Sequence, residues 1–165
     1  MRIAVLADIH GNLVALESVL SNVKESNVDQ IILLGDLITG FPNETNSILD
    51  LLKMTTDFII KGNREHYILN MNEESFNYDQ FKPLVQTYNI ITNRNYEYIS
   101  KLPEQISILY SEQLSLKCVH GSPFSMFDKI EENNTEIIEK SIRNINEKIL
   151  LCGQLIYNGI KNSME

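Results

Sequence analysis

The chain has 165 residues, of which 43% are hydrophobic and 22% charged, and its formal net charge is −8. This length is enough for one domain with its own hydrophobic core. The acidic balance argues against extended binding to nucleic acid or to an anionic membrane, because both need a basic protein face. No apolar run reaches the length of a membrane span, so we expect no membrane partner.

The cysteines and the N-terminus predict a cytoplasmic protein. Cys118 and Cys152 each lie inside an apolar run, which is typical of buried free thiols in a reducing compartment. The first residues enter a predicted strand at once and show no small-residue cleavage site of a signal peptide.

Strands and helices are predicted to alternate over the first part of the chain. Apolar runs of strand length favour strands buried on both faces, and apolar residues at helical spacing favour amphipathic helices. The predicted elements are a strand over 2–7, a helix over 13–25, a strand over 30–34, a helix that begins at Pro42 with Asn43 as its N-cap, and a strand over 57–61. This order predicts βαβαβ units with a parallel sheet.

The second part of the chain reads differently, because two strands follow each other directly. In order, we predict two or three helices over 64–101 ended by Pro103, a hairpin of strands 106–110 and 114–119, a helix over 134–147 and a strand over 148–152. The pattern shows no repeat and no linker. We therefore predict one α/β domain over residues 1–165.

Polar side chains follow the predicted strands. Asp8 and His10 follow the first strand, Asp36 the second, Asn63 the third and His120 the second strand of the hairpin. Each alone could be a cap or a turn residue, but strand ends of a parallel sheet meet at one edge. If the first strand stays extended, Asp8 and His10 point the same way. Carboxylate, imidazole and amide groups together suit ions such as Mn, Fe, Zn or Co.

With these residues the chain resembles the calcineurin-like metallophosphoesterase superfamily, and among its members the small bacterial phosphoesterases. The blocks that carry the resemblance are Asp8-Ile9-His10, Gly35-Asp36, Gly62-Asn63-Arg64-Glu65 and His120-Gly121. They lie in the family's order and span residues 1–153. The fold that the resemblance implies is an αββα sandwich built on βαβαβ units.

The resemblance also implies a two-metal centre and its chemistry. Asp8, His10 and Asp36 would hold one ion, and Asp36, Asn63 and His120 the second. The cofactors would be two divalent ions of Mn, Fe, Zn, Co or Ni, with Mn favoured. The implied reaction is hydrolysis of a small phosphomono- or phosphodiester by a water that the ions activate.

The chain departs from the family where a histidine usually follows Gly-Asn. Arg64 stands there, and arginine cannot act as a general acid near neutral pH, although it can clamp a phosphate. His66 could take the catalytic role instead, or it could be a surface residue of a helix. We name Arg64 and His66 as the candidate catalytic residues.

A second departure follows Gly153, where the family has Gly-His-x-His and this chain has Gln154-Leu155-Ile156. We expect a domain truncated after about residue 153, with an incomplete second sheet and reduced activity. Gln154 could offer the second ion a weak carbonyl oxygen. The uncovered sheet could pair with a second copy of the chain. The alternative function is a non-catalytic homologue that binds metal or phosphate weakly, or serves as an association module.

Overall fold

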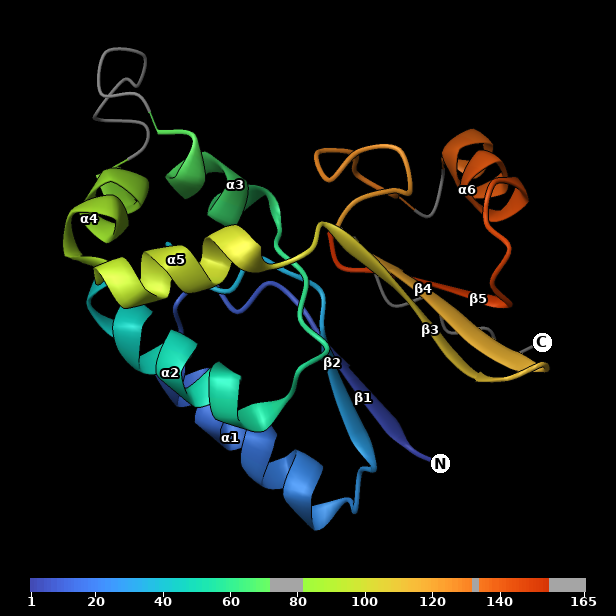
Figure 1. Cartoon of the computed structure of the whole chain (residues 1–165), viewed down its shortest axis with the longest axis horizontal. Coiled ribbons are helices and arrows are strands. Elements are labelled where there is room, and N and C mark those ends of the chain that lie inside the picture. The colour runs from blue at the N-terminus through green and yellow to red at the C-terminus, as the bar shows by residue number, and fades with distance from the viewer. Residues whose placement is uncertain (72–81, 132–133, 155–165) are drawn as a thin grey trace, which may run out of the picture.

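The computed structural model describes residues 1–71, 82–131 and 134–154. Its elements are β1 (Ile3–Leu6), α1 (Leu13–Glu25), β2 (Gln30–Leu33), the 3-10 helix η1 (Pro42–Glu44), α2 (Thr45–Thr55), α3 (Asn63–Leu69), α4 (Lys82–Ile90), α5 (Asn93–Lys101), β3 (Gln105–Ser111), β4 (Leu114–Val119), α6 (Thr135–Arg143) and β5 (Ile149–Cys152). Figure 1 shows α1 to α5 on one side of β1 and β2, and the sheet of β3, β4 and β5 on the other side, with α6 beyond it. This is the expected αββα order.

The first sheet pairs β1 with β2 in parallel, as the βαβ pattern predicts. The predicted third strand over 57–61 is wrong in extent, because only a single parallel bridge from Leu33 to Ile59 forms there. Leu33 donates to the carbonyl oxygen of Phe58 at 2.9 Å, and Ile60 donates back to Leu33 at 3.0 Å. The next amide, of Lys61, turns away to the carbonyl oxygen of Pro103 at 2.9 Å, which ends the ladder.

The second sheet has the order β3-β4-β5. The hairpin of β3 and β4 is antiparallel, and β5 joins the other edge of β4 in parallel. The predicted hairpin and the predicted last strand are both confirmed. The carboxyl ends of β4 and β5 lie side by side, so His120 and Gly153 follow neighbouring strands.

Alternating residues of β2 supply two separate cores. Leu33 faces a cluster that includes Leu16 of α1 and Leu52 of α2. Ile32 faces the opposite way, toward Leu116 of β4 and its neighbours. Because side chains of a strand alternate between faces, one continuous apolar run buries both sides of the first sheet. The two clusters hold β2 in the middle of the sandwich.

Most of the predicted helices are confirmed, with two local corrections. Asn43 is not an N-cap, because it lies within η1, for which Phe41 is the capping residue and Pro42 the first position. The helix predicted over 134–147 ends at Arg143. None of the helices in the described ranges has the length and apolar character needed to cross a membrane.

Candidate metal centre

The loops that follow β1 and β2 run together beyond the sheet. Asp8 donates its backbone N–H to the carbonyl oxygen of Gly35 at 3.1 Å, and His10 donates to that of Asp36 at 2.9 Å. Asp8, His10 and Asp36 have left-handed φ angles of 55°, 48° and 53°. The extended path from Asp8 to His10, on which their shared direction was conditional, therefore does not form. These uncommon conformations are typical of functional sites, where the surrounding structure holds them.

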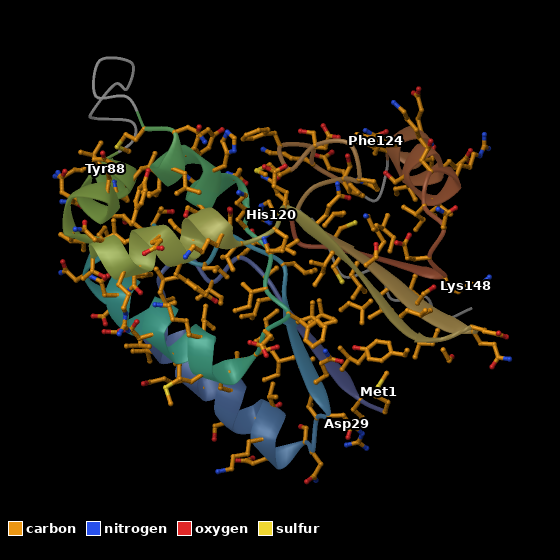
Figure 2. All side chains as sticks on the ribbon, viewed as in Figure 1. Met1, Asp29, Tyr88, His120, Phe124 and Lys148 are labelled. Carbon is orange, nitrogen blue, oxygen red and sulfur yellow. The ribbon has the colours of Figure 1, made fainter. Side chains whose placement is uncertain are left out.

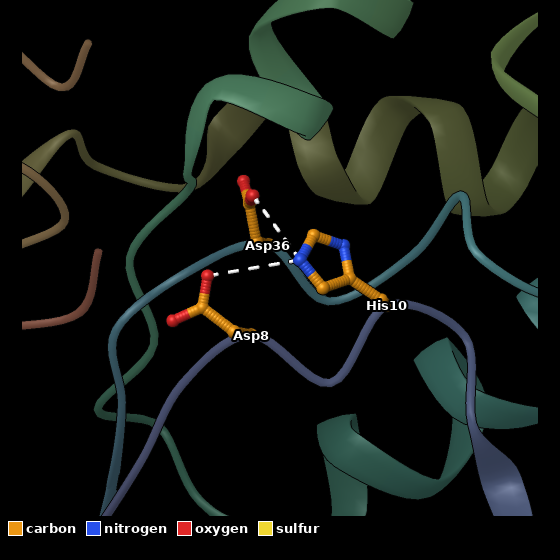
Figure 3. A group of neighbouring side chains, drawn as sticks. All are labelled: Asp8, His10 and Asp36. Atoms are coloured by element: carbon orange, nitrogen blue, oxygen red, sulfur yellow. Dashed lines mark ion pairs between the residues drawn. The ribbon is translucent and has the colours of Figure 1, made fainter. Parts of the chain in front are cut away.

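The left-handed turns bring Asp8, His10 and Asp36 together (Figure 3), and one candidate ligand atom of each lies within 4.8 Å of the others. Nε2 of His10 is 3.7 Å from Oδ1 of Asp8 and 3.7 Å from Oδ2 of Asp36. These distances are too long for hydrogen bonds. The Asp8 and His10 side chains are 35% and 37% exposed, so an ion could reach the space between them from solvent.

The two carboxylates of this group repel each other. Burial first, and then the charge of Asp36, raise the pKa of Asp8 above its ordinary value. A bound cation would favour the ionised form and reverse that shift. The chemistry of the group is therefore that of a cation site.

A second group lies deeper, around His120, which Figure 2 places where the helical side meets the three-stranded sheet. Nδ1 of His120 is 2.6 Å from the carbonyl oxygen of Leu34, and because a carbonyl can only accept, Nδ1 carries the proton. When the ring carries only this proton, Nε2 offers a lone pair. It lies 2.9 Å from Oδ1 of Asn63 and 3.3 Å from Oδ1 of Asp36. Three acceptors that face one another in this way fit a divalent ion.

Asp36 belongs to both groups and is 2% exposed. Its Oδ1 faces His120 and its Oδ2 faces His10. The backbone N–H of Arg64 also donates to Oδ1 at 2.9 Å, which fixes the plane of the carboxylate. A carboxylate that turns one oxygen toward each ligand group has the arrangement of a bridging ligand.

Gly62 has to lack a side chain at this point of the fold. A Cβ atom there would lie 2.3 Å from Oδ1 of Asp36 and 2.9 Å from Cε1 of His120. The glycine before Asn63 therefore lets the loop pass directly against the two groups.

The two candidate catalytic residues occupy different surroundings. Nε of Arg64 lies 3.8 Å from Oδ2 of Asp36, and the side chain is 39% exposed, so its guanidinium borders the metal centre. The ring of His66 packs edge-on against Phe127, with ring centroids 5.2 Å apart, and also against Tyr67. His66 is half-buried rather than a fully exposed surface residue.

Gln154 lies beside the deeper group. Its backbone N–H donates to the carbonyl oxygen of His120 at 2.8 Å, and a Cβ on the preceding Gly153 would lie 3.0 Å from Nδ1 of His120. Oε1 of Gln154 is buried and finds no hydrogen-bond partner among the described residues. An unpaired buried amide oxygen is a weak candidate ligand at this position.

Glu65 is not among the residues that the sequence pattern predicts for the site, yet it is fully buried beside it. Its carboxylate accepts the backbone N–H groups of Gly62, Asp36, Leu37 and Ile38, at 2.8, 3.0, 2.8 and 3.3 Å. Burial first, and then the charge of Asp36, raise the pKa of Glu65 to about 7, and the N–H groups of Gly62, Leu37 and Ile38 act against that rise. Only the ionised form can accept all of them. The sequence signal is a glutamate at the third position of a helix, as in a capping box.

Comparisons with known proteins concern the family and the fold of the chain. A family model described as calcineurin-like phosphoesterase matches residues 1–158. An uncharacterized protein of Methanocaldococcus jannaschii is 27% identical over 158 residues, which are 95% of this chain and 60% of that relative. The chain thus spans about 60% of the length of the curated relative that it matches.

Two solved structures share the fold. A metallophosphoesterase from Sphaerobacter thermophilus has a TM-score of 0.73 and 24% identity, over 92% of this chain and 59% of that chain. A hypothetical protein from Pyrococcus horikoshii has a TM-score of 0.70 and 22% identity, over 92% of this chain and 68% of the other. Both likenesses concern the fold alone. Because the family model covers nearly the whole sequence, the chain belongs to the calcineurin-like phosphoesterase family.

Proposed function

We propose that this protein is a metal-dependent phosphoesterase that hydrolyses phosphomono- or phosphodiesters of small molecules, with reduced activity. The observation that supports this best is Asp36, whose two carboxylate oxygens face two separate groups of candidate ligands. Membership in the family supports metal-dependent hydrolysis of phosphate esters. The two groups of candidate ligands support the binding of two ions.

Each residue of the centre has a role in this proposal. Asp8, His10 and Asp36 would hold the more exposed ion, and Asp36, Asn63 and His120 would hold the deeper one. Divalent ions bound there, with Mn favoured, would supply positive charge for the phosphoryl oxygens and a lowered pKa for water. They also give an acidic protein a local positive field that attracts an anionic substrate.

Arg64 is the proposed phosphate clamp. Its guanidinium is partly exposed and lies at the border of the centre, 3.8 Å from Asp36, where it can donate hydrogen bonds to phosphate oxygens. It keeps its proton near neutral pH and so cannot protonate a leaving group. His66, whose ring packs against Phe127, is the candidate for that proton transfer.

Reduced activity is expected from the residue at position 154. Gln154 stands where the family pattern has a histidine, and an amide oxygen is a poorer ligand than imidazole for Mn, Fe, Zn or Co. This weak ligand, whose Oε1 is buried and has no hydrogen-bond partner among the described residues, is also what favours the second candidate function. In that function the protein binds metal or phosphate weakly and does not turn over a substrate.

Hydrolysis of p-nitrophenyl phosphate and bis(p-nitrophenyl) phosphate, with and without added Mn²⁺, tests the proposal. We expect Mn²⁺-dependent release of p-nitrophenol, and Asp36→Asn should lower it by more than about 100-fold, since a shared ligand matters more than an outer-shell partner. Asp50→Asn is the matched control, because Asp50 lies on α2 and forms its ion pair with Arg94 of α5. Equal rates in the parent and Asp36→Asn would refute the assignment.

Gln154→His separates the two candidate functions. If the parent is a weakened enzyme, the added imidazole should raise both Mn²⁺ affinity and kcat. If the parent binds Mn²⁺ but hydrolyses neither ester, and Gln154→His does not change this, the non-catalytic function is the better account. Binding is measured by calorimetry, so the two outcomes are distinct.

A further inference from the structure

Glu65 is a fully buried charged residue that has no part in the proposed chemistry. Burying a carboxylate is costly unless hydrogen bonds replace its water. Here both oxygens are satisfied by main-chain donors: Oε1 accepts from Leu37 and Ile38, and Oε2 accepts from Asp36 and Gly62. The side chain therefore connects two loops that are far apart in the sequence.

The first of these loops has an uncommon backbone conformation. Gly35, Asp36 and Thr39 all have left-handed φ angles, of 88°, 53° and 90°. Backbone hydrogen bonds from the loop after β1 hold part of it, and the amides of Asp36, Leu37 and Ile38 converge on the Glu65 carboxylate. Converging N–H groups of this kind attract an anion, and here the carboxylate occupies that place.

The second loop leads from Gly62 into α3, which carries Asn63 and Glu65 itself. Because Glu65 accepts from the amides of Gly62 and Asp36 with the same oxygen, Oε2, it sets the distance between the two loops. Asp36 lies on one loop and Asn63 on the other, and both face Nε2 of His120.

We propose that Glu65 is a positioning residue of the metal centre: it holds the left-handed loop so that Asp36 meets both ligand groups. It binds no ion and contacts no substrate. The proposal rests on the proposed function, since it concerns the placing of the bridging ligand. Glu65 acts on the position of Asp36 through the backbone, because its carboxylate accepts a hydrogen bond from the Asp36 N–H.

Glu65→Gln is the sharpest test, because it keeps the size of the side chain. The four hydrogen-bond partners that the carboxylate has among the described residues are all backbone N–H donors. The NH₂ group of a glutamine side chain would therefore face two N–H groups and would find no acceptor there. Ile68→Ala is the matched control: Ile68 is buried on the same helix, and its truncation destabilises α3 but leaves in place the hydrogen bonds from the loop to Glu65. Thermal unfolding is measured for both, so that binding is compared in folded protein.

The readout is Co²⁺ binding, followed by calorimetry and by the visible spectrum of the ion. We expect Glu65→Gln to weaken Co²⁺ by about 10–100-fold and to alter the spectrum, as for other outer-shell changes. Ile68→Ala should keep the parent affinity within about threefold and the parent spectrum. Parent-like Co²⁺ binding by Glu65→Gln, or an equal loss in Ile68→Ala, would overturn the proposal.

Hydrogen exchange of the amides of Asp36, Leu37 and Ile38 separates this proposal from the proposed function. If the parent binds no Co²⁺, the metal centre itself is refuted. The exchange experiment needs no metal: faster exchange at these amides in Glu65→Gln, but not in Ile68→Ala, supports the positioning of the loop. Unchanged exchange in Glu65→Gln overturns it.

Discussion

The two halves of the candidate centre are built in different ways. Around His120 the side chains are buried and linked by short contacts, such as 2.9 Å to Asn63 and 2.6 Å to the carbonyl oxygen of Leu34. Around His10 the side chains are about one-third exposed, and its nearest carboxylate oxygens lie 3.7 Å away. We call these the deep half and the open half.

The difference shows what each half depends on. The deep half is held by the fold itself, because His120 bonds to the end of β2 and Gly62 packs directly against it. The open half is held only through its backbone loops, and its side chains do not hydrogen-bond to one another. We therefore expect the deep half to be formed in the metal-free protein, and the open half to close around an ion.

His120→Ala should have the largest effect on stability. It removes a fully buried ring and leaves the buried carbonyl oxygen of Leu34 without the donor that Nδ1 supplies. Unpaired buried groups of this kind cost about 1–3 kcal/mol, and the cavity adds to that. Urea unfolding of the metal-free protein measures the loss. A change below about 0.5 kcal/mol would show that the deep half is not preformed.

His10→Ala is the matched change in the open half. Because His10 is partly exposed and makes no short side-chain contact, the metal-free protein should lose less than about 0.5 kcal/mol of unfolding free energy. Mn²⁺ affinity should nevertheless fall, since a direct ligand is removed. Stability losses of equal size in His10→Ala and His120→Ala would erase the distinction between the halves.

A smaller effect concerns the strand that carries His120. Burial raises the pKa of the Cys118 thiol, two residues before His120, to about 11 from its usual 9. The unfolded chain loses this proton above pH 9, but the folded chain keeps it until about pH 11. The stability present below pH 9 should therefore fall by about 2 kcal/mol as the pH rises through 11.

Urea unfolding between pH 8 and pH 11 measures the total fall. Burial also raises the pKa of the Cys152 thiol to about 11, so Cys118→Ala should remove about half of that total. A steeper fall in Cys118→Ala than in the parent would contradict the burial of this thiol beneath the deep half.

The amino-acid sequence predicted the structure best where the spacing of apolar residues alone determines a strand or a helix. The apolar runs predict β1, β2, β4 and β5, and the helical stripe predicts α1 with its observed bounds. Asp8 and Asp36 are also readable as strand-end residues, because parallel strands bring their carboxyl ends to one edge, whereas His120 follows β4 of the second sheet. The cytoplasmic location, pairing with a second copy of the chain and the absence of extended nucleic-acid binding stay predictions, as does a single domain over residues 1–165.

Errors arose where distant backbone decides the outcome. The strand over 57–61 is one bridge, because Lys61 finds its partner at Pro103 and not in the sheet. Asp8 and His10 meet through left-handed turns and not through an extended strand. The backbone groups that decide these two outcomes lie far away in the sequence, so the local pattern does not indicate them.

The sequence by itself determined the family motifs, the order of the strands and the identity of the candidate ligands. Only the tertiary structure decided that Asp36 faces both halves and that Glu65 holds its loop. The physical reason is that left-handed turns and buried carboxylates are stable only when distant N–H groups satisfy them. Those N–H groups come from loops that meet only in the folded chain.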